Sequence, residues 1–357
     1  MIAHESCHIF GALDEYSLSS CNCTDKGGEL QVENGNCKLC ATKFVPCIME
    51  ANTLAMCDYT RGQLGWRTPL LRWNFLLQTG TGLHQTGDEF EFFFVDWDRD
   101  GIPDLVAVKK SGTGTGTTEV HIFSGASGFK TPILQTGTGL HQTDHTFQFC
   151  MTDWNLDGIP DLVAIKKSGT GTRTTEVHIF SGVSRFQNAV LHTGTGLHET
   201  DHTFAFGMAR WRLTRWGGRP DLFAIKKSQT GTRSTEVHIF SAASGFARAV
   251  LQTGTPLHET DDAFDFLVAP FTRFGLPDVI AIKKRNTGTQ STEIHVLSGI
   301  SRYQEFVEQS GSALHPTDQS FAFAPVEWDR NNTAIEIAAI KKQATGTGST
   351  EVHILQQ

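Results

Sequence analysis

The chain has 357 residues and a formal net charge of −8, with 39% hydrophobic and 19% charged residues. This composition is typical of a globular protein of about two or three domains, and the acidic excess argues against nucleic acid or an anionic membrane as the partner. No apolar run reaches the roughly 18–20 residues of a membrane-spanning helix, so no membrane span is expected.

The first part of the chain, residues 1–66, opens with the pattern His-Glu-x-x-His-x-x-Gly-x-x-Asp. His4 and His8 are four residues apart, so on a helix they share one face and can bind one metal ion. Glu5 stands beside the first histidine, where a general base for a metal-activated water is needed. The pattern therefore predicts a metal site with hydrolytic chemistry.

The residues after this predicted helix complete the site. Gly11 permits a sharp turn, and Asp14 follows His4 by ten residues, where it can return as a third ligand. Glu15 is an alternative third ligand. The longer pattern is far more specific than the short helical one.

These residues resemble the metzincin zinc peptidases, in the minority pattern that has Asp as the third ligand. The resemblance implies Glu5 as general base and acid, and Met49, in the run Cys47-Ile48-Met49, as the residue of a turn beneath the metal. It implies a zinc site whose ligands are His4, His8 and Asp14. Zinc in such a site polarises the scissile carbonyl and lowers the pKa of its bound water to about 7. The resemblance lacks the upstream sheet of the family, so we interpret this part as a truncated catalytic domain.

Cysteines gather in the same part of the chain. Seven of the eight precede residue 60, namely Cys7, Cys21, Cys23, Cys37, Cys40, Cys47 and Cys57. Such density predicts disulfides and an extracellular, secreted protein whose signal peptide is missing from this sequence. The pairs Cys21-x-Cys23 and Cys37-x-x-Cys40 could instead bind a structural zinc ion. Seven is an odd number, and Cys7 is the candidate for an unpaired thiol; Cys150 is expected to be a buried thiol.

The rest of the chain, residues 67–357, repeats itself five times. A Lys-Lys pair marks each repeat, in steps of 57, 60, 57 and 58 residues, and a Glu-x-His run follows the same steps. Self-similarity at such a period predicts a repeat architecture. The first lysines of the pairs are Lys109, Lys166, Lys226, Lys283 and Lys341.

Each repeat contains four runs typical of strands, and helical periodicity is absent. In the second repeat they are residues 147–154, 162–167, 175–180 and 189–197. Four short strands per repeat predict a mainly β fold, a five-bladed β-propeller with four-stranded blades. A lone fourth-strand run at 74–83 precedes the repeats, and the last repeat stops after its third run at 351–355, so the leading strand is expected to close the ring. An open array or a fragment of a larger ring is the alternative.

Acidic loops begin two of the repeats. Oxygen side chains at alternating positions converge on a hard cation, and the glycine among them allows the sharp turn. The two sets are Asp96, Asp98, Asp100 and Asp104, and Asp153, Asn155, Asp157 and Asp161. Ala107 and Ala164 occupy the positions where an EF-hand needs Glu. The loops resemble those of FG-GAP or VCBS repeats in integrin-like propellers, and the resemblance implies calcium binding. A polar turn without an ion is the alternative. The fifth repeat keeps Glu327, Asp329 and Asn331, a doubtful site.

The repeated lysines and histidines are interpreted as solvent-facing residues that recur with the rest of the repeat. The tryptophans near the acidic loops are expected to pack between blades rather than to stack on sugars.

The sequence thus predicts a secreted zinc endopeptidase acting on peptide or protein substrates, with Zn²⁺ and Ca²⁺ as cofactors and a propeller that tethers or presents it. The alternative is a non-catalytic, lectin-like propeller that binds glycans or proteins. A structural, calcium-stabilised spacer is a third interpretation.

Overall fold

The computed structural model describes residues 2–28, 31–41, 45–51, 53, 55–64, 71–211, 218–271, 275–329 and 335–357. The chain divides into two compact units, Met1–Leu70 and Leu71–Gln357, and each is described by itself. The predicted boundary between residues 66 and 67 lies outside the described residues. Among the helices of the described residues, none has the length and apolar character needed to cross a membrane.

The first unit has little regular structure. It contains helices α1 (Ile2–Ile9) and α2 (Asp58–Gln63), a 3₁₀ turn at Ser17–Ser19, and strands β1 (Lys26–Gly27) and β2 (Val32–Glu33), which pair antiparallel. Cys57 is the N-cap residue of α2, and its sulfur accepts the Thr60 N–H. The apolar core consists of Cys7, Ala12, Cys47, Ile48, Met49 and Cys57. Two disulfides, Cys21–Cys37 and Cys23–Cys40, cross-link the loops around this small core.

The second unit consists of strands that fall into five groups of four, which we number from one to five. The first group holds β4 (Phe90–Val95), β5 (Asp104–Lys109), β6 (Thr117–Phe123) and β7 (Pro132–His141). The second holds β8 (Phe147–Thr152), β9 (Asp161–Lys166), β10 (Thr174–Phe180) and β11 (Ala189–His198). The third holds β12 (Phe204–Ala209), β13 (Asp221–Lys226), β14 (Ser234–Phe240) and β15 (Ala249–His258). The fourth holds β16 (Phe264–Ala269), β17 (Asp278–Lys283), β18 (Glu293–Leu297) and β19 (Phe306–Ser312). The fifth holds β20 (Phe321–Val326), β21 (Glu336–Lys341), β22 (Ser349–Gln356) and β3 (Leu71–His84).

Within each group the strands pair antiparallel in sequence order, so the described strands form four-stranded sheets in a propeller-like arrangement. The fourth and fifth groups join into one eight-stranded sheet, because β19 pairs with β3 in parallel. The second strand of each group is covered on both faces, as its continuous apolar run predicts. In β9, for example, the five residues from Asp161 to Ile165 are all buried.

The leading strand completes the last group, as predicted from the sequence. β3 pairs antiparallel with β22, with Leu355 opposite Phe75 and Ser349 opposite His84. β3 therefore lies beside β22 as β7 lies beside β6. Its backbone pairs with the N–H and C=O groups of β22, which would otherwise be an exposed edge strand.

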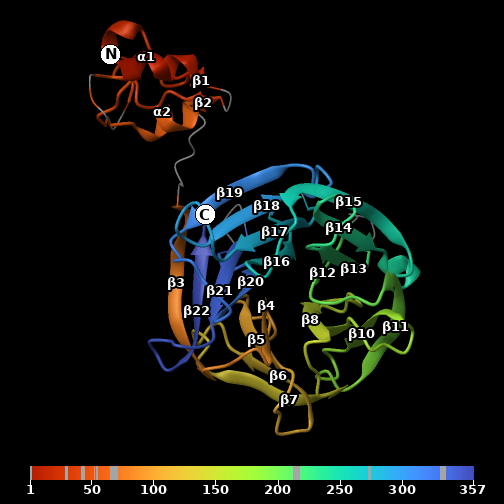
Figure 1. Ribbon diagram of the computed structural model, residues 1–357. Helices are drawn as coiled ribbons and strands as arrows, with labels where there is room; N and C mark the ends of the chain where they lie inside the picture. The colour runs from red at the N-terminus through yellow and green to blue at the C-terminus, as the bar shows by residue number, and fades with distance from the viewer. Residues whose placement is uncertain are drawn as a thin grey trace. The chain divides into compact units, whose positions relative to one another are not determined.

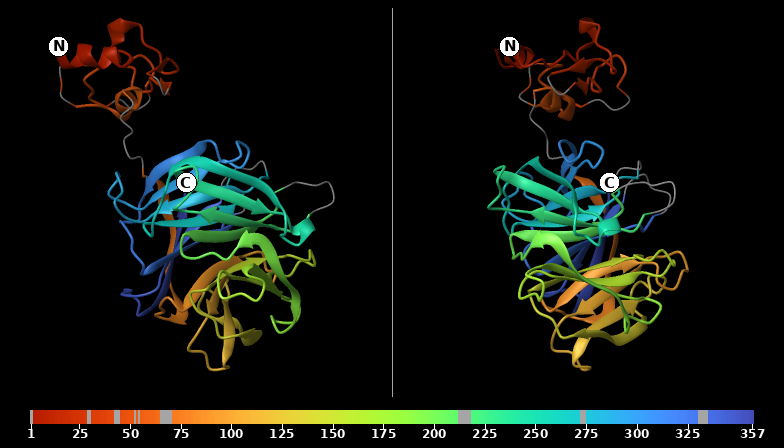
Figure 2. Two further views of the ribbon diagram at one scale, coloured as in Figure 1. Left: turned by 45° about the vertical axis from the view of Figure 1, so that its right-hand side comes forward. Right: turned by 90° about the vertical axis from the view of Figure 1, so that its right-hand side faces the viewer.

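The first strands of the groups surround a common axis. β4, β8, β12, β16 and β20 each lie against the next, and β20 lies against β4. Figure 1 views this ring along its axis, with β3, β7, β11, β15 and β19 on the outside, and Figure 2 turns it to the side. Backbone hydrogen bonds cross each junction, from the N–H of a threonine to the carbonyl of the second lysine in the preceding Lys-Lys pair. These are Thr143 to Lys110, Thr200 to Lys167, Thr260 to Lys227, Thr317 to Lys284 and Thr86 to Lys342.

Candidate metal sites

The two histidines and the aspartate of the sequence pattern converge in the first unit. Nε2 of His4 and Nε2 of His8 each lie 3.1 Å from Oδ1 of Asp14. Ligands at about 2.1 Å from a tetrahedral zinc ion are about 3.4 Å apart, so these three atoms have nearly the spacing of a zinc shell. Oδ1 of Asp14 is buried and makes no hydrogen bond within the described part of the chain. The residues present therefore fit a zinc ion.

Backbone carbonyls hold both imidazole rings in the orientation that a metal site needs. Nδ1 of His4 donates to the carbonyl of Ile48 at 2.8 Å, and Nδ1 of His8 donates to the carbonyl of Ala12 at 2.7 Å. These bonds fix the proton on Nδ1, so that each Nε2 offers its lone pair toward Asp14. They also explain the local chain path. The helix ends at Ile9, and Gly11 has a φ of +85°, which turns the chain so that Ala12 lies next to His8.

Met49 lies in a turn whose backbone carbonyls bond to the residues around this arrangement. Its side chain is fully buried in the core of the unit, and its carbonyl accepts the N–H of Glu15 at 3.0 Å. The carbonyl that orients His4 belongs to the preceding residue, Ile48. The Cys47-Ile48-Met49 run thus orients the His4 ring through the Ile48 carbonyl.

The two candidate third ligands have separate environments. The fully buried Glu15 carboxylate accepts hydrogen bonds from Asn36 at 2.6 Å and from the side chains of Cys57 and Thr60, both at 2.8 Å. Only Asp14 stands with His4 and His8. Glu15 is therefore used to hold the unit together.

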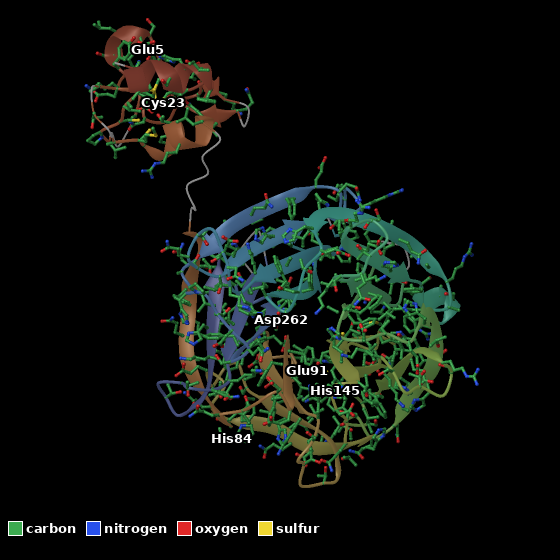
Figure 3. All side chains as sticks on the ribbon, in the orientation of Figure 1. Glu5, Cys23, His84, Glu91, His145 and Asp262 are labelled. Atoms are coloured by element: carbon green, nitrogen blue, oxygen red, sulfur yellow. A yellow bond between two sulfur atoms is a disulfide. The ribbon has the colours of Figure 1, made fainter. Side chains whose placement is uncertain are left out.

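Two further side chains border the site. Glu5 lies on α1 and is exposed, which leaves it open to water (Figure 3). The hydroxyl of Tyr16 donates to Oδ2 of Asp14 at 3.3 Å, and the Asp14 charge raises the pKa of Tyr16. The sequence reasoning missed Tyr16. Its only signal was its position two residues after the third ligand.

Four of the cysteines that were candidates for zinc form disulfides instead. The pairing crosses the two short motifs, joining Cys21 to Cys37 and Cys23 to Cys40. Cys7 is a free thiol as predicted, but Cys47 and Cys57 are thiols as well. The hydrogen bond from the Cys57 thiol lowers the pKa of Cys47 to about 7. The N–H of Cys57, which donates to the sulfur of Cys47 at 3.1 Å, adds to this effect.

The first acidic loop of the second unit brings three carboxylates together. Ligand oxygens of Asp96, Asp98 and Asp100 lie within 4.8 Å of one another. Gly101 has a φ of +93° and donates its N–H to Oδ2 of Asp96 at 3.1 Å. Closely spaced carboxylates on a turn are the donor set of a calcium site.

The second loop has the same turn with one amide. Gly158 has a φ of +85° and donates to Oδ2 of Asp153 at 3.0 Å, and Asp157 N–H donates to the side-chain oxygens of Asp153 and Asn155 at 3.1 and 3.0 Å. The Arg99 guanidinium lies near this loop, because a Cβ at Gly158 would lie 3.2 Å from its Nη2. This nearby cation weakens the attraction of the second loop for a dication.

The fourth acid of each set has a different role. Asp104 is fully buried, and its two oxygens accept the N–H groups of Trp97 at 2.9 Å and Gly125 at 2.8 Å. Burial raises the pKa of Asp104. Asp161 and Asp221 make the same bridge from the loop to the next hairpin. At the same position, Asp278 accepts the Gly299 N–H and Glu336 accepts the Trp328 N–H. Because repeats without an acidic loop keep this acid, its primary role is to join the loop to the sheet.

The fifth loop retains Glu327 and Asp329, while Asn331 lies outside the described residues.

The tryptophans lie between groups, as predicted. Trp97 of the first group stacks on Phe186 of the second, with ring centroids 5.3 Å apart. Trp211 meets Tyr303 of the fourth group at 5.5 Å. Trp154 of the second group instead makes a cation–π contact, with the guanidinium of Arg219 from the third group over its ring, 4.1 Å from the ring centroid.

The prediction that the repeated lysines face solvent was only half right. The first lysine of a pair lies over a phenylalanine of its own group, such as Lys166 over Phe147 at 5.8 Å. The second lysine points the opposite way, and in four of the five pairs it lines the cavity inside the ring. Strand alternation requires two neighbours to face opposite sides, but only the ring shows that one of those sides is a channel.

Comparisons with known proteins agree with the repeat assignment. Residues 96–164 match the FG-GAP-like repeat, a span that contains both acidic loops. No curated protein matches the chain. Among solved structures, the chain is similar to one described as the crystal structure of BBS1N in complex with ARL6DN, soaked with lead, with 12% identity and a TM-score of 0.39 over 80% of this chain and 96% of that one.

Proposed function

We propose that the first unit is the metal-binding part of a secreted zinc endopeptidase. The observation that carries the proposal is the convergence of two imidazole Nε2 atoms on one carboxylate oxygen, each at 3.1 Å. The hydrogen bonds from Nδ1 of His4 and His8 to carbonyls add support, because metal-binding histidines typically have such partners. The two disulfides are compatible with an extracellular protein.

The residues would divide the chemistry as follows. His4, His8 and Asp14 hold the zinc ion, which supplies polarisation of a peptide carbonyl and acidification of water. Glu5 accepts a proton from the attacking water and passes it to the leaving amine. Tyr16 keeps the Asp14 carboxylate oriented through its hydroxyl. Peptides or proteins are the substrates.

Zinc content and peptide hydrolysis test the two halves of this proposal separately. We expect one zinc ion per folded chain by elemental analysis, and its loss in His8→Ala and Asp14→Asn. Glu5→Gln is the matched control, because Glu5 is no ligand. It should retain zinc and lose casein cleavage. Folded protein without zinc would refute the site, and unchanged cleavage by Glu5→Gln would refute the catalytic role.

For the second unit we propose a five-bladed propeller, with groups one to five as its blades, that binds calcium at Asp96, Asp98 and Asp100. The cyclic order of the inner strands supports the blade number. The FG-GAP-like match supports a binding module, and glycans or proteins are its candidate ligands.

Calcium should raise the stability of the folded ring, by about 2.7 kcal/mol at a concentration of 100 times the dissociation constant. Equal melting temperatures in calcium and chelator would refute the calcium site. A glycan array without signal in calcium would refute the glycan alternative.

A further inference from the structure

The second lysines of the five Lys-Lys pairs surround one end of the channel through the ring. A cavity of about 610 Å³ lies there, lined by all five inner strands and by Lys167, Lys227, Lys284 and Lys342. Figure 3 shows the labelled Glu91 and Asp262 near the middle of the ring. The end of the channel where the inner strands begin therefore combines four lysines with the acids Asp88, Glu91 and Asp265.

Three of these five lysines are neutralised by carboxylates. Glu91 and Asp265 occupy the same position, the second residue of the inner strand, whereas Asp88 comes from the loop before β4. The fivefold pattern of cations therefore has no matching fivefold pattern of anions. The pairs are Lys110–Glu91 at 3.3 Å, Lys284–Asp265 at 2.9 Å and Lys342–Asp88 at 2.6 Å.

Lys167 and Lys227, in adjacent groups, lack such a partner. Gln148 and Ala205 stand where the first repeat has Glu91, and neither lysine makes an ion pair or side-chain hydrogen bond with the described residues. Burial lowers the pKa of both lysines, and the charges of Glu91 near Lys167 and of Asp265 near Lys227 offset only part of this effect. An unpaired, partly buried ammonium is costly unless an anion accompanies it.

The carboxylates near these two lysines are already engaged. Asp265 pairs with Lys284, and Asp262 pairs with Arg285 at 2.6 Å. His202, from the loop before β12, also lines the cavity. Glu91 pairs with Lys110, and Asp201 and Asp261 accept hydrogen bonds from Thr203 and Ala263. Neither Lys167 nor Lys227 therefore has a carboxylate to itself.

The channel wall beyond the lysines is apolar. Phe93, Leu267 and Ala324 line the same cavity. Each is the fourth residue of its inner strand, two residues after the position that Glu91 occupies in β4. A ligand that places its charge between the lysines would therefore rest its body on apolar surface, which is the usual composition of a small-molecule site.

We propose that the channel binds a small organic carboxylate, with its carboxylate between Lys167 and Lys227 and its apolar body against Phe93, Leu267 and Ala324. Charge-assisted hydrogen bonds from two ammonium groups hold the head. The apolar wall favours such a ligand over inorganic phosphate. The proposal is independent of the zinc site.

Calorimetric titration of the folded chain with phenylacetate tests this, with inorganic phosphate as a second probe and chloride at matched ionic strength. We expect saturable binding of phenylacetate, tighter than that of phosphate. The Lys167→Gln/Lys227→Gln variant should lose at least about tenfold in affinity, because both charged donors to the head are gone. Circular dichroism checks that the variant remains folded.

The neighbouring lysines supply a matched control. Lys166 and Lys226 lie over Phe147 and Phe204, outside the cavity. Lys166→Gln/Lys226→Gln removes the same charge from the same strands and should change affinity less than twofold. Equal losses in the two double variants, no loss in the first, or no saturable phenylacetate binding would overturn the proposal. Tighter binding of phosphate than of phenylacetate would overturn the assignment of an organic carboxylate.

Discussion

At the scale of single residues, the same residue type has different roles at different positions of a repeat. In the Asp-x-Asp-x-Asp-Gly-x-x-Asp pattern the first three acids gather on an exposed turn, while Asp104 is buried and joins that turn to the hairpin through Trp97 and Gly125. Spacing alone made all four look like calcium ligands. The distinction depends on burial, which no local pattern encodes.

Asparagine substitution should separate these two roles. Asp104→Asn places an amide NH2 group against one of the two backbone N–H donors, so we expect the free energy of unfolding to fall by about 1–3 kcal/mol, in chelator as well as in calcium. Asp98→Asn, on the exposed turn, should change stability in chelator by less than about 0.5 kcal/mol and abolish the calcium-induced rise in melting temperature. Thermal denaturation of both variants with and without calcium measures this. An Asp104→Asn protein as stable as wild type in chelator would contradict the structural role.

At the scale of elements, neighbouring groups approach so closely that only glycine fits at the contact. The N–H of Gly139 on β7 donates to the carbonyl of Phe186 in the second group at 2.9 Å. A Cβ at Gly139 would lie 2.3 Å from the carbonyl oxygen of Gln187. Gly82 and Gly196 make the same contact. The glycine-threonine repeats of the fourth strands are therefore part of the packing between groups.

Gly139→Ala should destabilise the ring by about 1–3 kcal/mol or more, since the opposing atom is backbone and cannot rotate away. Gly171→Ala is the matched control in a loop of the neighbouring repeat. Its Cβ would meet only Glu176 Oε1, at 3.8 Å, so we expect no loss and up to about 1 kcal/mol of stabilisation. Chemical denaturation of the two variants provides the comparison. Equal stabilities would show that the groups can move apart at this contact.

At the scale of the whole molecule, the third strands carry a repeated Glu-His pair whose titration bears on the stability of the ring. Burial lowers the pKa of the four histidines His121, His178, His295 and His353. Burial alone would raise the pKa of the partner Glu119, but hydrogen bonds from Thr115 and His121 more than offset it and leave the pKa lowered. Both groups release protons on folding.

We therefore expect the melting temperature to fall as the pH is lowered from 7. Below the unfolded histidine pKa of about 6.5 the unfolded state binds more protons than the folded state, so stability decreases toward the lowered folded pKa values. The glutamates extend the loss below about pH 4.5. Asp104 and Asp161, whose pKa values burial raises, oppose it only in that acidic range. Calorimetry between pH 7 and 5 measures the effect, and His121→Gln/His178→Gln should have a smaller slope. A constant or rising melting temperature would contradict this account.

Much of the fold was predictable, because strand pattern and period are local properties. The runs expected at 162–167 and 175–180 are β9 and β10 with shifts of one residue, and the closing strand expected at 74–83 is β3. The pairing of Cys21 with Cys37 was not predictable, since four cysteines allow three connectivities. The separate environments of Asp14 and Glu15 depend on the turn at Met49 and on Asn36, which are distant in sequence. The inward orientation of the second lysines could not be predicted without knowing which strand lines the axis.

The pairing of β22 with β3 places Gln356 opposite Asn74. At the equivalent place in the first group, a loop joins β6 to β7. A linker of similar length could therefore connect the last residue to Leu71, and new termini could be opened in the hairpin of any other group. Such a circular permutant should regain the same ring, since every strand keeps its neighbours. The order in which the strands are translated would change, and with it the moment during synthesis at which the ring can shut.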